Sequence, residues 1–156
     1  MADYYTTFSE QLTFKTRQGA TWAQKYLEQF NGEIDEDNPK SEELEALADL
    51  YELESDYFVL EFQWDISQEN KKWGIWMRSE ENGNPDHVAQ FVQAYLKKFD
   101  PQGCFGLSWA ATCSKMRTDA FGGGAIFITA ETIDWMHTGD WIFKKRQSFN
   151  EKKKAS

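Results

Sequence analysis

An alternating run between residues 57 and 66 constrains the fold of this chain more than any other feature. Large apolar side chains occupy every second position, and mostly polar ones fill the positions between them. Successive side chains of a β-strand point to opposite faces, so the pattern predicts a strand with one face in a core. A polar turn at 67–71 and a second strand-like stretch at 73–78 complete a predicted hairpin. The large apolar positions are Phe58, Leu60, Phe62, Trp64 and Ile66.

Strand and helix patterns follow one another along the rest of the chain. Alternation predicts strands, and apolar residues spaced by three and four predict helices with one buried face. The order resembles the split βαβ arrangement, so we expect an α+β, ferredoxin-like two-layer sandwich with about five mostly antiparallel strands. The expected strands are 8–14, 57–66, 73–78, 105–113 and 125–129, and the expected helices are 22–30, 44–51 and 88–99.

The helix expected at 44–51 belongs to an acidic segment that adds to this sandwich. Residues 33–56 hold eleven acidic residues and one basic residue, which gives this segment a net charge of −10. The whole chain has a net charge of −9, so the remaining residues sum to +1. A solvated acidic helix explains this concentration, and so does a surface that imitates nucleic-acid charge and binds a basic protein. The candidate partner-binding residues are Glu42, Glu43, Glu45, Asp49 and Glu52.

The C-terminal part has the opposite charge. We expect Thr129 to cap a short helix that contains Ile133 and Met136. We also expect residues 140–149 to form a helical segment that lies against the sheet. We expect one domain over residues 1–149 and a basic, disordered tail over 150–156. The amino terminus lacks a signal-peptide pattern and no long apolar run is present, so we expect a cytoplasmic protein without membrane contact.

A polar stretch ending in three glycines joins the two strands expected at 105–113 and 125–129. Glycine backbone amides beside basic side chains can hold an anion, and neighbouring cations favour a thiolate. A hairpin whose glycines permit a bulge explains the same residues without a ligand. The candidate ligand-binding residues are Cys113, Lys115, Arg117, Gly122, Gly123 and Gly124.

Several other chemistries find little basis in the sequence. Two histidines and two separated cysteines do not form a zinc pattern, and the acidic segment lacks the spacing of a calcium loop, so no metal or other cofactor is expected. Trp76 and Phe127 on an open sheet face would suit base stacking, but an acidic domain is poorly suited to phosphate contact. We therefore expect no direct nucleic-acid binding.

The run from Trp109 to Ala125, followed by residues 126–130, resembles a group of small uncharacterised bacterial, phage and plasmid proteins. It reads W-x3-C-S-K-x-R-x3-F-G-G-G-A. The similarity extends back through the Trp76 strand and forward to Trp141, and it leaves out the acidic region. The resemblance implies a mobile-element setting and no catalytic residues.

Together these features predict a non-enzymatic accessory or inhibitor-type protein that binds another protein through its acidic surface, and a basic nucleic-acid-binding protein is one such partner. The alternative is a small enzyme or an anion- or nucleotide-binding protein that uses the 113–124 stretch. The identity of the partner and the oligomeric state stay open.

Overall fold

Six strands form one antiparallel sheet, which is the main layer of the molecule. The structure is a computed structural model and describes residues 1–33, 41–54 and 57–155. The strand order in the sheet is β4-β5-β1-β6-β7-β8, and two short strands, β2 and β3, pair separately. The strands are β1 (Tyr4–Thr13), β2 (Gly32–Glu33), β3 (Tyr57–Phe58), β4 (Gln63–Glu69), β5 (Lys72–Ser79), β6 (Cys104–Cys113), β7 (Gly122–Thr129) and β8 (Ile133–His137).

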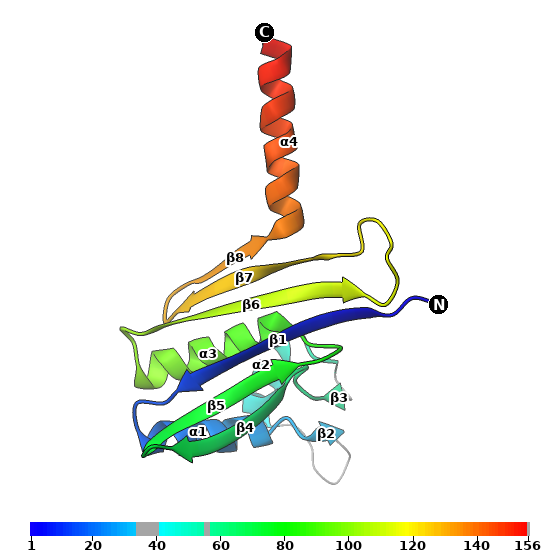
Figure 1. The fold of residues 1–156 in the computed structure, drawn as a ribbon. Coiled ribbons are helices and arrows are strands. Elements are labelled where there is room, and N and C mark those ends of the chain that lie inside the picture. Colours follow the sequence, from blue (N-terminus) through cyan, green and yellow to red (C-terminus); the bar gives the residue numbers. More distant parts are fainter. Residues whose placement is uncertain (34–40, 55–56, 156) are drawn as a thin grey trace.

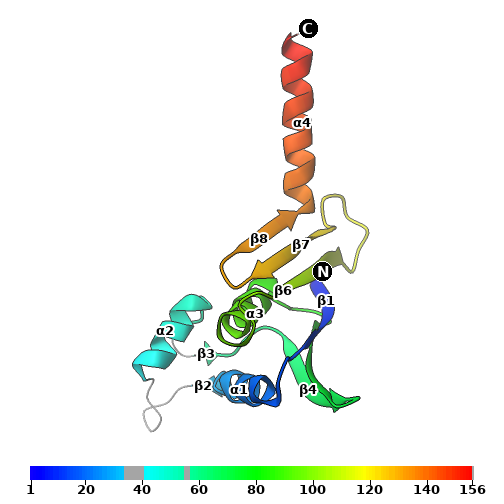
Figure 2. The ribbon, with the colours of Figure 1, turned by 90° about the vertical axis from the view of Figure 1, so that its left-hand side faces the viewer.

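Three helices lie on one side of this sheet, and the fourth projects away from it (Figure 1 and Figure 2). Of the three, α1 contacts β5, and α3 contacts β6 and β7. The opposite side of the sheet carries no helix in either view. The helices are α1 (Arg17–Glu28), α2 (Glu42–Leu50), α3 (Pro85–Phe99) and α4 (Thr138–Ala155).

A polar capping residue precedes each of the first three helices. The Thr16 hydroxyl accepts from the third residue beyond it at the start of α1, and the Ser41 hydroxyl does the same for α2 at 3.2 Å. The Asn84 side chain accepts from the Asp86 N–H at 3.0 Å, and Pro85 occupies the first position of α3. These contacts satisfy amide groups that a helix start leaves without partners.

The core lies between α1, α3 and the inner face of the sheet. Side chains of β5 and β7 on this face are fully buried, as is one face of α3. Burying a large apolar side chain contributes about 1.5–3 kcal/mol, so this layer carries much of the stability. The residues with essentially no exposure include Ile75, Met77, Ile126, Ile128, Val88, Phe91 and Val92.

The mixed α+β architecture expected from the sequence is confirmed, but the number of strands differs. Among the described residues there are six strands in the main sheet and two outside it, where the sequence predicts about five. The sequence Asn-Pro-Lys-Ser at residues 38–41 also predicts a helix cap, and of these residues only Ser41 is described. The acidic residues Asp35, Glu36, Asp37 and Asp56 lie outside the described residues as well.

The predicted strand at 57–66 is wrong as one element, because the run divides into β3 and β4. Phe58 pairs with Gly32 in the small ribbon, and the ladder with β5 begins only at Gln63. Between them, the Glu61 N–H donates to the ring of His87, and the Glu61 carbonyl accepts from the Asn84 N–H at 2.8 Å. The start of α3 therefore takes the backbone groups that a continuous strand would use.

The short helix predicted after Thr129 is also wrong. Residues Ile133–His137 form β8, which pairs with β7 from Ile128 to Gly124. The Thr129 hydroxyl instead accepts from the N–H groups of Glu131 and Thr132 in the turn between the strands. Strand pairing wins here because β7 would otherwise have a free edge.

The predicted segment at 140–149 is helical but does not lie against the sheet. All residues of α4 are exposed, and the helix follows β8 without an intervening loop. It continues to Ala155, so it includes residues 150–155, which the sequence analysis assigns to a disordered tail.

Replacing Phe91 by Ala tests this assignment of the core. Phe91 is fully buried in α3 and its ring meets those of Trp22, Tyr26 and Phe62. We expect Phe91→Ala to lower the free energy of unfolding by about 3–5 kcal/mol, measured by urea denaturation. Lys97→Ala, at an exposed position of the same helix, should change it by less than about 0.5 kcal/mol. Equal effects would contradict the assignment.

Candidate functional site

The acidic face of α2, which we define as Glu42, Glu43, Glu45 and Asp49 of the helix together with Glu52 just beyond its end, is held in position by buried residues on the other side of the helix. All five acidic residues are exposed, and no ion pair with a described residue involves them. On the other face Ala48 and Tyr51 are buried, and the Tyr51 hydroxyl is 2.8 Å from the Tyr26 hydroxyl. The structure thus groups all the partner-binding residues predicted from the sequence.

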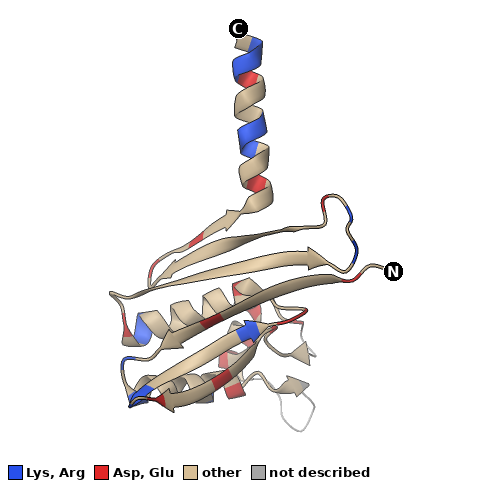
Figure 3. Ribbon diagram, in the orientation of Figure 1, with Lys and Arg blue, Asp and Glu red and all other residues tan. Residues whose placement is uncertain are grey.

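A pocket opens beside the end of α2 and extends this acidic surface. It has a volume of about 320 Å³. Its lining includes four acidic residues and one histidine, which we call the acidic pocket: Glu52, Glu54, Glu61, Asp86 and His87. Figure 3 shows acidic residues on α2 and on the segments beside it, whereas most of the basic residues of α4 lie at the far end of the molecule. The pocket therefore suits a cationic group.

His87 is a structural element of this pocket. Its Nδ1 accepts the Glu61 N–H at 2.9 Å, so the proton is on Nε2, which lies 3.0 Å from the Tyr51 carbonyl oxygen and donates to it. Burial lowers the pKa of His87 because the charged imidazolium loses its hydration, although the Tyr51 carbonyl opposes the shift. With both nitrogens occupied, the ring ties α2 and the segment before β4 to α3.

The sequence alone does not reveal this role of His87. Its position near the start of a predicted helix carries no indication of partners 36 and 26 residues away. Both contacts are to backbone groups. Because every residue has these groups, the residue types in the sequence do not indicate such contacts.

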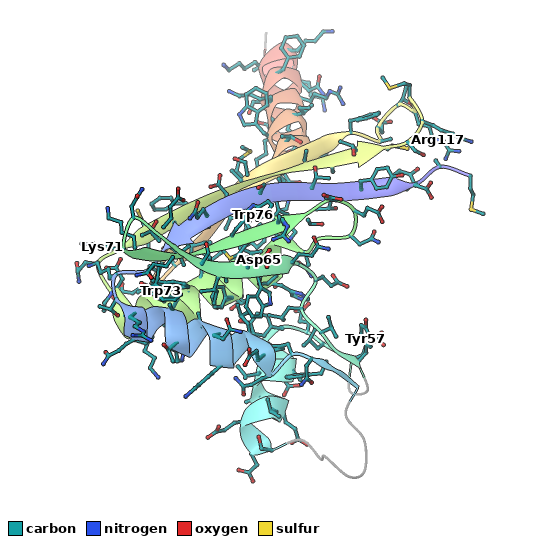
Figure 4. All side chains as sticks on the ribbon, turned by 60° about the horizontal axis from the view of Figure 1, so that its bottom comes forward. Tyr57, Asp65, Lys71, Trp73, Trp76 and Arg117 are labelled. Carbon is teal, nitrogen blue, oxygen red and sulfur yellow. The ribbon has the colours of Figure 1, made fainter. Side chains whose placement is uncertain are left out.

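The predicted ligand-binding residues at 113–124 are distributed over two strands and an exposed loop. Cys113 is buried at the end of β6, opposite Tyr4 of β1. Lys115 and Arg117 are exposed in the loop between β6 and β7, and Figure 4 shows Arg117 at the outer rim of the molecule. The two cations therefore do not lie in a cavity with the glycines, and a ligand site here stays a prediction.

The glycines of this stretch have a structural explanation. Gly122, Gly123 and Gly124 belong to β7, between β6 and β8. Gly123 has a φ of +142°, and a Cβ there would lie 2.3 Å from the Trp109 carbonyl oxygen. A Cβ at Gly124 would lie 2.1 Å from the Met136 carbonyl oxygen. Only glycine fits where these backbones approach so closely.

The uncovered side of the sheet forms a second exposed surface, which we call the open face and define by Trp76, Arg78, Gly106, Ser108, Phe127 and Met136. Strand pairing places Phe127 opposite Gly106, and Ser108 opposite Ala125, which pairs in turn with Met136. Phe127 is 50% exposed, Met136 48% and Trp76 46%.

Arg78 and Trp76 form the other end of the open face. The Arg78 guanidinium lies over the Trp76 ring, 3.9 Å from its centroid, and pairs with Asp65 at 2.8 Å. Figure 4 shows Trp76 and Asp65 on the neighbouring strands β5 and β4. Large apolar surface and small residues thus share one sheet face.

No group of three or more His, Cys, Asp or Glu residues within the described ranges is arranged to hold a metal ion. Across the same residues, no helix has the length and apolar character needed to span a membrane.

Comparisons with protein-family models, curated proteins and solved structures found no match to this chain. The resemblance based on the 109–130 region stays a prediction.

Replacing Gly123 by Ala tests whether the glycines serve the backbone. We expect Gly123→Ala to lower the free energy of unfolding by about 2 kcal/mol or more, because the new Cβ would meet the Trp109 carbonyl at a positive φ. Gly122→Ala is the matched control, since its Cβ would meet only the Thr138 hydroxyl at 3.3 Å. It should cost less than about 0.5 kcal/mol by urea denaturation. A tolerated Gly123→Ala would refute this explanation.

The buried state of His87 predicts a pH dependence of stability. The pKa of His87 is lowered by folding, so the unfolded chain binds a proton that the folded chain excludes. The free energy of unfolding should therefore fall as pH drops through about 6.5, the unfolded value, and this effect should be absent above it. The measurement is the urea midpoint at about pH 8 and about pH 5.5.

His87→Gln provides the control, because glutamine does not titrate. The variant is expected to be less stable at both pH values, but its midpoint should differ less between them. An identical pH dependence in the two proteins would contradict the role assigned to His87.

Proposed function

We propose that this chain acts by binding another protein, without catalysing a reaction, and that the acidic face of α2 binds a basic surface of that partner. The observation that supports the proposal is an array of exposed carboxylates on a helix that is anchored to the core. An accessory or inhibitor role in a mobile-element setting fits this mode of action.

The anchoring matters because fixed charges bind a complementary surface better than mobile ones. The buried side chain of Tyr51 holds the end of α2, and the Ser41 cap holds its start. Glu42 and Asp49 are about 10 Å apart along the helix axis. The partner therefore meets carboxylates whose spacing is already set, so less conformational entropy is lost on binding.

The acidic pocket extends the binding surface beyond α2. Glu52, Glu54, Glu61 and Asp86 line it, and none of them has an ion pair with a described residue. A lysine or arginine side chain of the partner can enter a space of about 320 Å³. Arginine and lysine are also the residues with which proteins contact nucleic-acid phosphates, so a nucleic-acid-binding protein is the partner class we propose.

The alternative function, catalysis or anion binding by the 113–124 stretch, has less support. Lys115 and Arg117 are exposed in a loop at the rim, and Cys113 is buried at a strand end. The close backbone contacts of Gly123 and Gly124 account for the glycines without a ligand.

We also propose that the first part of the fold is the ferredoxin-like arrangement expected from the sequence. The support is the strand order β4-β5-β1-β6, with α1 between β1 and β4 and α3 between β5 and β6. The strands β7 and β8 then extend this sheet by two.

Charge reversal on α2 tests the proposed function. The immobilised chain is used to capture basic proteins from an extract of its host, and each captured protein is purified and titrated against the wild type. We expect Glu45→Lys/Asp49→Lys to weaken binding of the captured protein at least about tenfold by calorimetry. Raising salt from about 0.05 to about 0.5 M should also weaken it, because salt screens exposed charges.

The control is Glu69→Lys/Glu131→Lys, which changes the net charge equally at exposed positions on other elements. It should bind within about twofold of the wild type. Equal losses in both variants would show a nonspecific charge effect and would overturn the proposal, as would the failure of any basic protein to bind.

A further inference from the structure

Helices α1 and α3 line a groove in which every charged residue is basic. The groove has a volume of about 590 Å³. We call it the basic groove and define it by three cations and two aromatic residues of its lining: Arg17, Lys25, Lys98, Trp22 and Phe99. The other residues that line it are uncharged. The charge of the groove therefore favours an anion as its ligand.

The three cations are free to contact a ligand. None of them has an ion pair with a described residue. Asp100, which caps the end of α3, is paired with Lys15 at 2.8 Å. Glu28 lies one turn beyond Lys25, and its carboxylate accepts a hydrogen bond from the Gln24 side chain. The acidic residues nearest to the groove in the sequence thus have other partners.

The helix dipoles explain two of the cations but not the third. Lys25 and Lys98 lie in the last turns of α1 and α3, where a positive charge is favourable. Arg17 occupies the first position of α1, where a positive charge is unfavourable, and the first turn of α1 holds no acidic residue. Figure 3 shows basic residues gathered at this end of the molecule, where β1 leads into α1. A bound anion would offset the unfavourable placement of Arg17.

The aromatic residues give the groove a surface for a ring. The Trp22 and Phe99 rings have centroids 5.6 Å apart, and the Lys98 ammonium lies 5.9 Å from the Trp22 centroid. Tyr26 and Phe91 contact the indole at 4.8 and 6.2 Å, and they lie 5.9 Å from each other. These three distances place Tyr26 and Phe91 on the same side of the indole, so another side lines the groove. A flat ring can pack there beside a cation.

We propose that the basic groove binds a nucleoside phosphate, with its base against the two aromatic residues and its phosphate groups on the three cations. Pockets for small organic ligands have volumes of about 300–1,000 Å³, and the groove is within that range. A free nucleotide fits better than a nucleic-acid strand, because a net charge of −9 repels a long polyanion more than a short one. No residue of the acidic face of α2 lines the groove, so this site is independent of the proposed function.

Calorimetric titration with ATP, adenosine and inorganic triphosphate tests both parts of the site. We expect ATP to bind the wild-type chain at least about tenfold more tightly than either fragment, because only ATP contacts the rings and the cations together. Arg17→Gln/Lys98→Gln should weaken ATP binding at least about tenfold. The matched control is Lys144→Gln/Arg146→Gln, which removes one lysine and one arginine at exposed positions of α4. The control should bind ATP within about twofold of the wild type.

Fluorine NMR locates the bound nucleotide. In a chain labelled with fluorotryptophan, ATP should shift the signal of Trp22 and leave the signal of Trp141 on α4 unchanged. Trp22→Phe and Trp141→Phe assign the two signals. Arg17 and Lys98 are exposed, and thermal unfolding checks that replacing them leaves the fold intact.

Four results would overturn the proposal. The first is a failure of ATP to bind at about 1 mM, or an unchanged Trp22 signal when it binds. The second is triphosphate binding as tight as that of ATP, which would indicate an anion site without a role for the rings. The third is an equal loss in the two double variants, which would indicate a nonspecific charge effect. The fourth is a short single-stranded oligonucleotide that competes with ATP and binds at least about tenfold more tightly, which would indicate a strand as the ligand.

Discussion

The pairing of β1 with both β5 and β6 is the constraint on which the rest of the structure depends. In the sheet, β1 alone joins the pair β4–β5 to the group β6–β7–β8. Phe8 and Leu12 turn inward from β1, and both are buried. Because α1 and α3 both pack against the inner face, the opposite face is left without a helix. The open face is therefore a consequence of how the sheet is connected.

Local sequence patterns predict most of the helices and strands, but they say little about how these elements pair and pack. The alternation at 73–78 and the helical spacing at 88–99 are intrinsic to those residues, and both elements form as expected. The division of 57–66 depends on backbone bonds from Glu61 to His87 and Asn84, which no local pattern records. Strand β8 likewise forms because β7 offers it a free edge, and residues 133–137 alone do not show this.

The candidate sites show the same division between local and distant information. The acidic face of α2 was predictable, since an apolar side of a helix fixes where the other side points. The acidic pocket was not, because it needs residues from α2, the segment before β4 and the start of α3. For the 113–124 stretch, the sequence pattern indicates a site that the structure does not require. Its glycines suggested a ligand, and the structure explains them by the carbonyls of Trp109 and Met136.

The long separation between β1 and β6 has a consequence for synthesis. Tyr4 pairs with Cys113, so during synthesis β1 waits for more than 100 residues before its edge toward β6 is covered. At ordinary elongation rates of about 5–20 residues per second, that delay is on the order of 5–20 s. During this delay the apolar side chains of Phe8 and Leu12, which are buried in the finished structure, are exposed to solvent. The nascent chain then presents an unpaired strand edge that favours aggregation. Translation speed and chaperone access therefore bear on β1, whose partner β6 is synthesised more than 100 residues later.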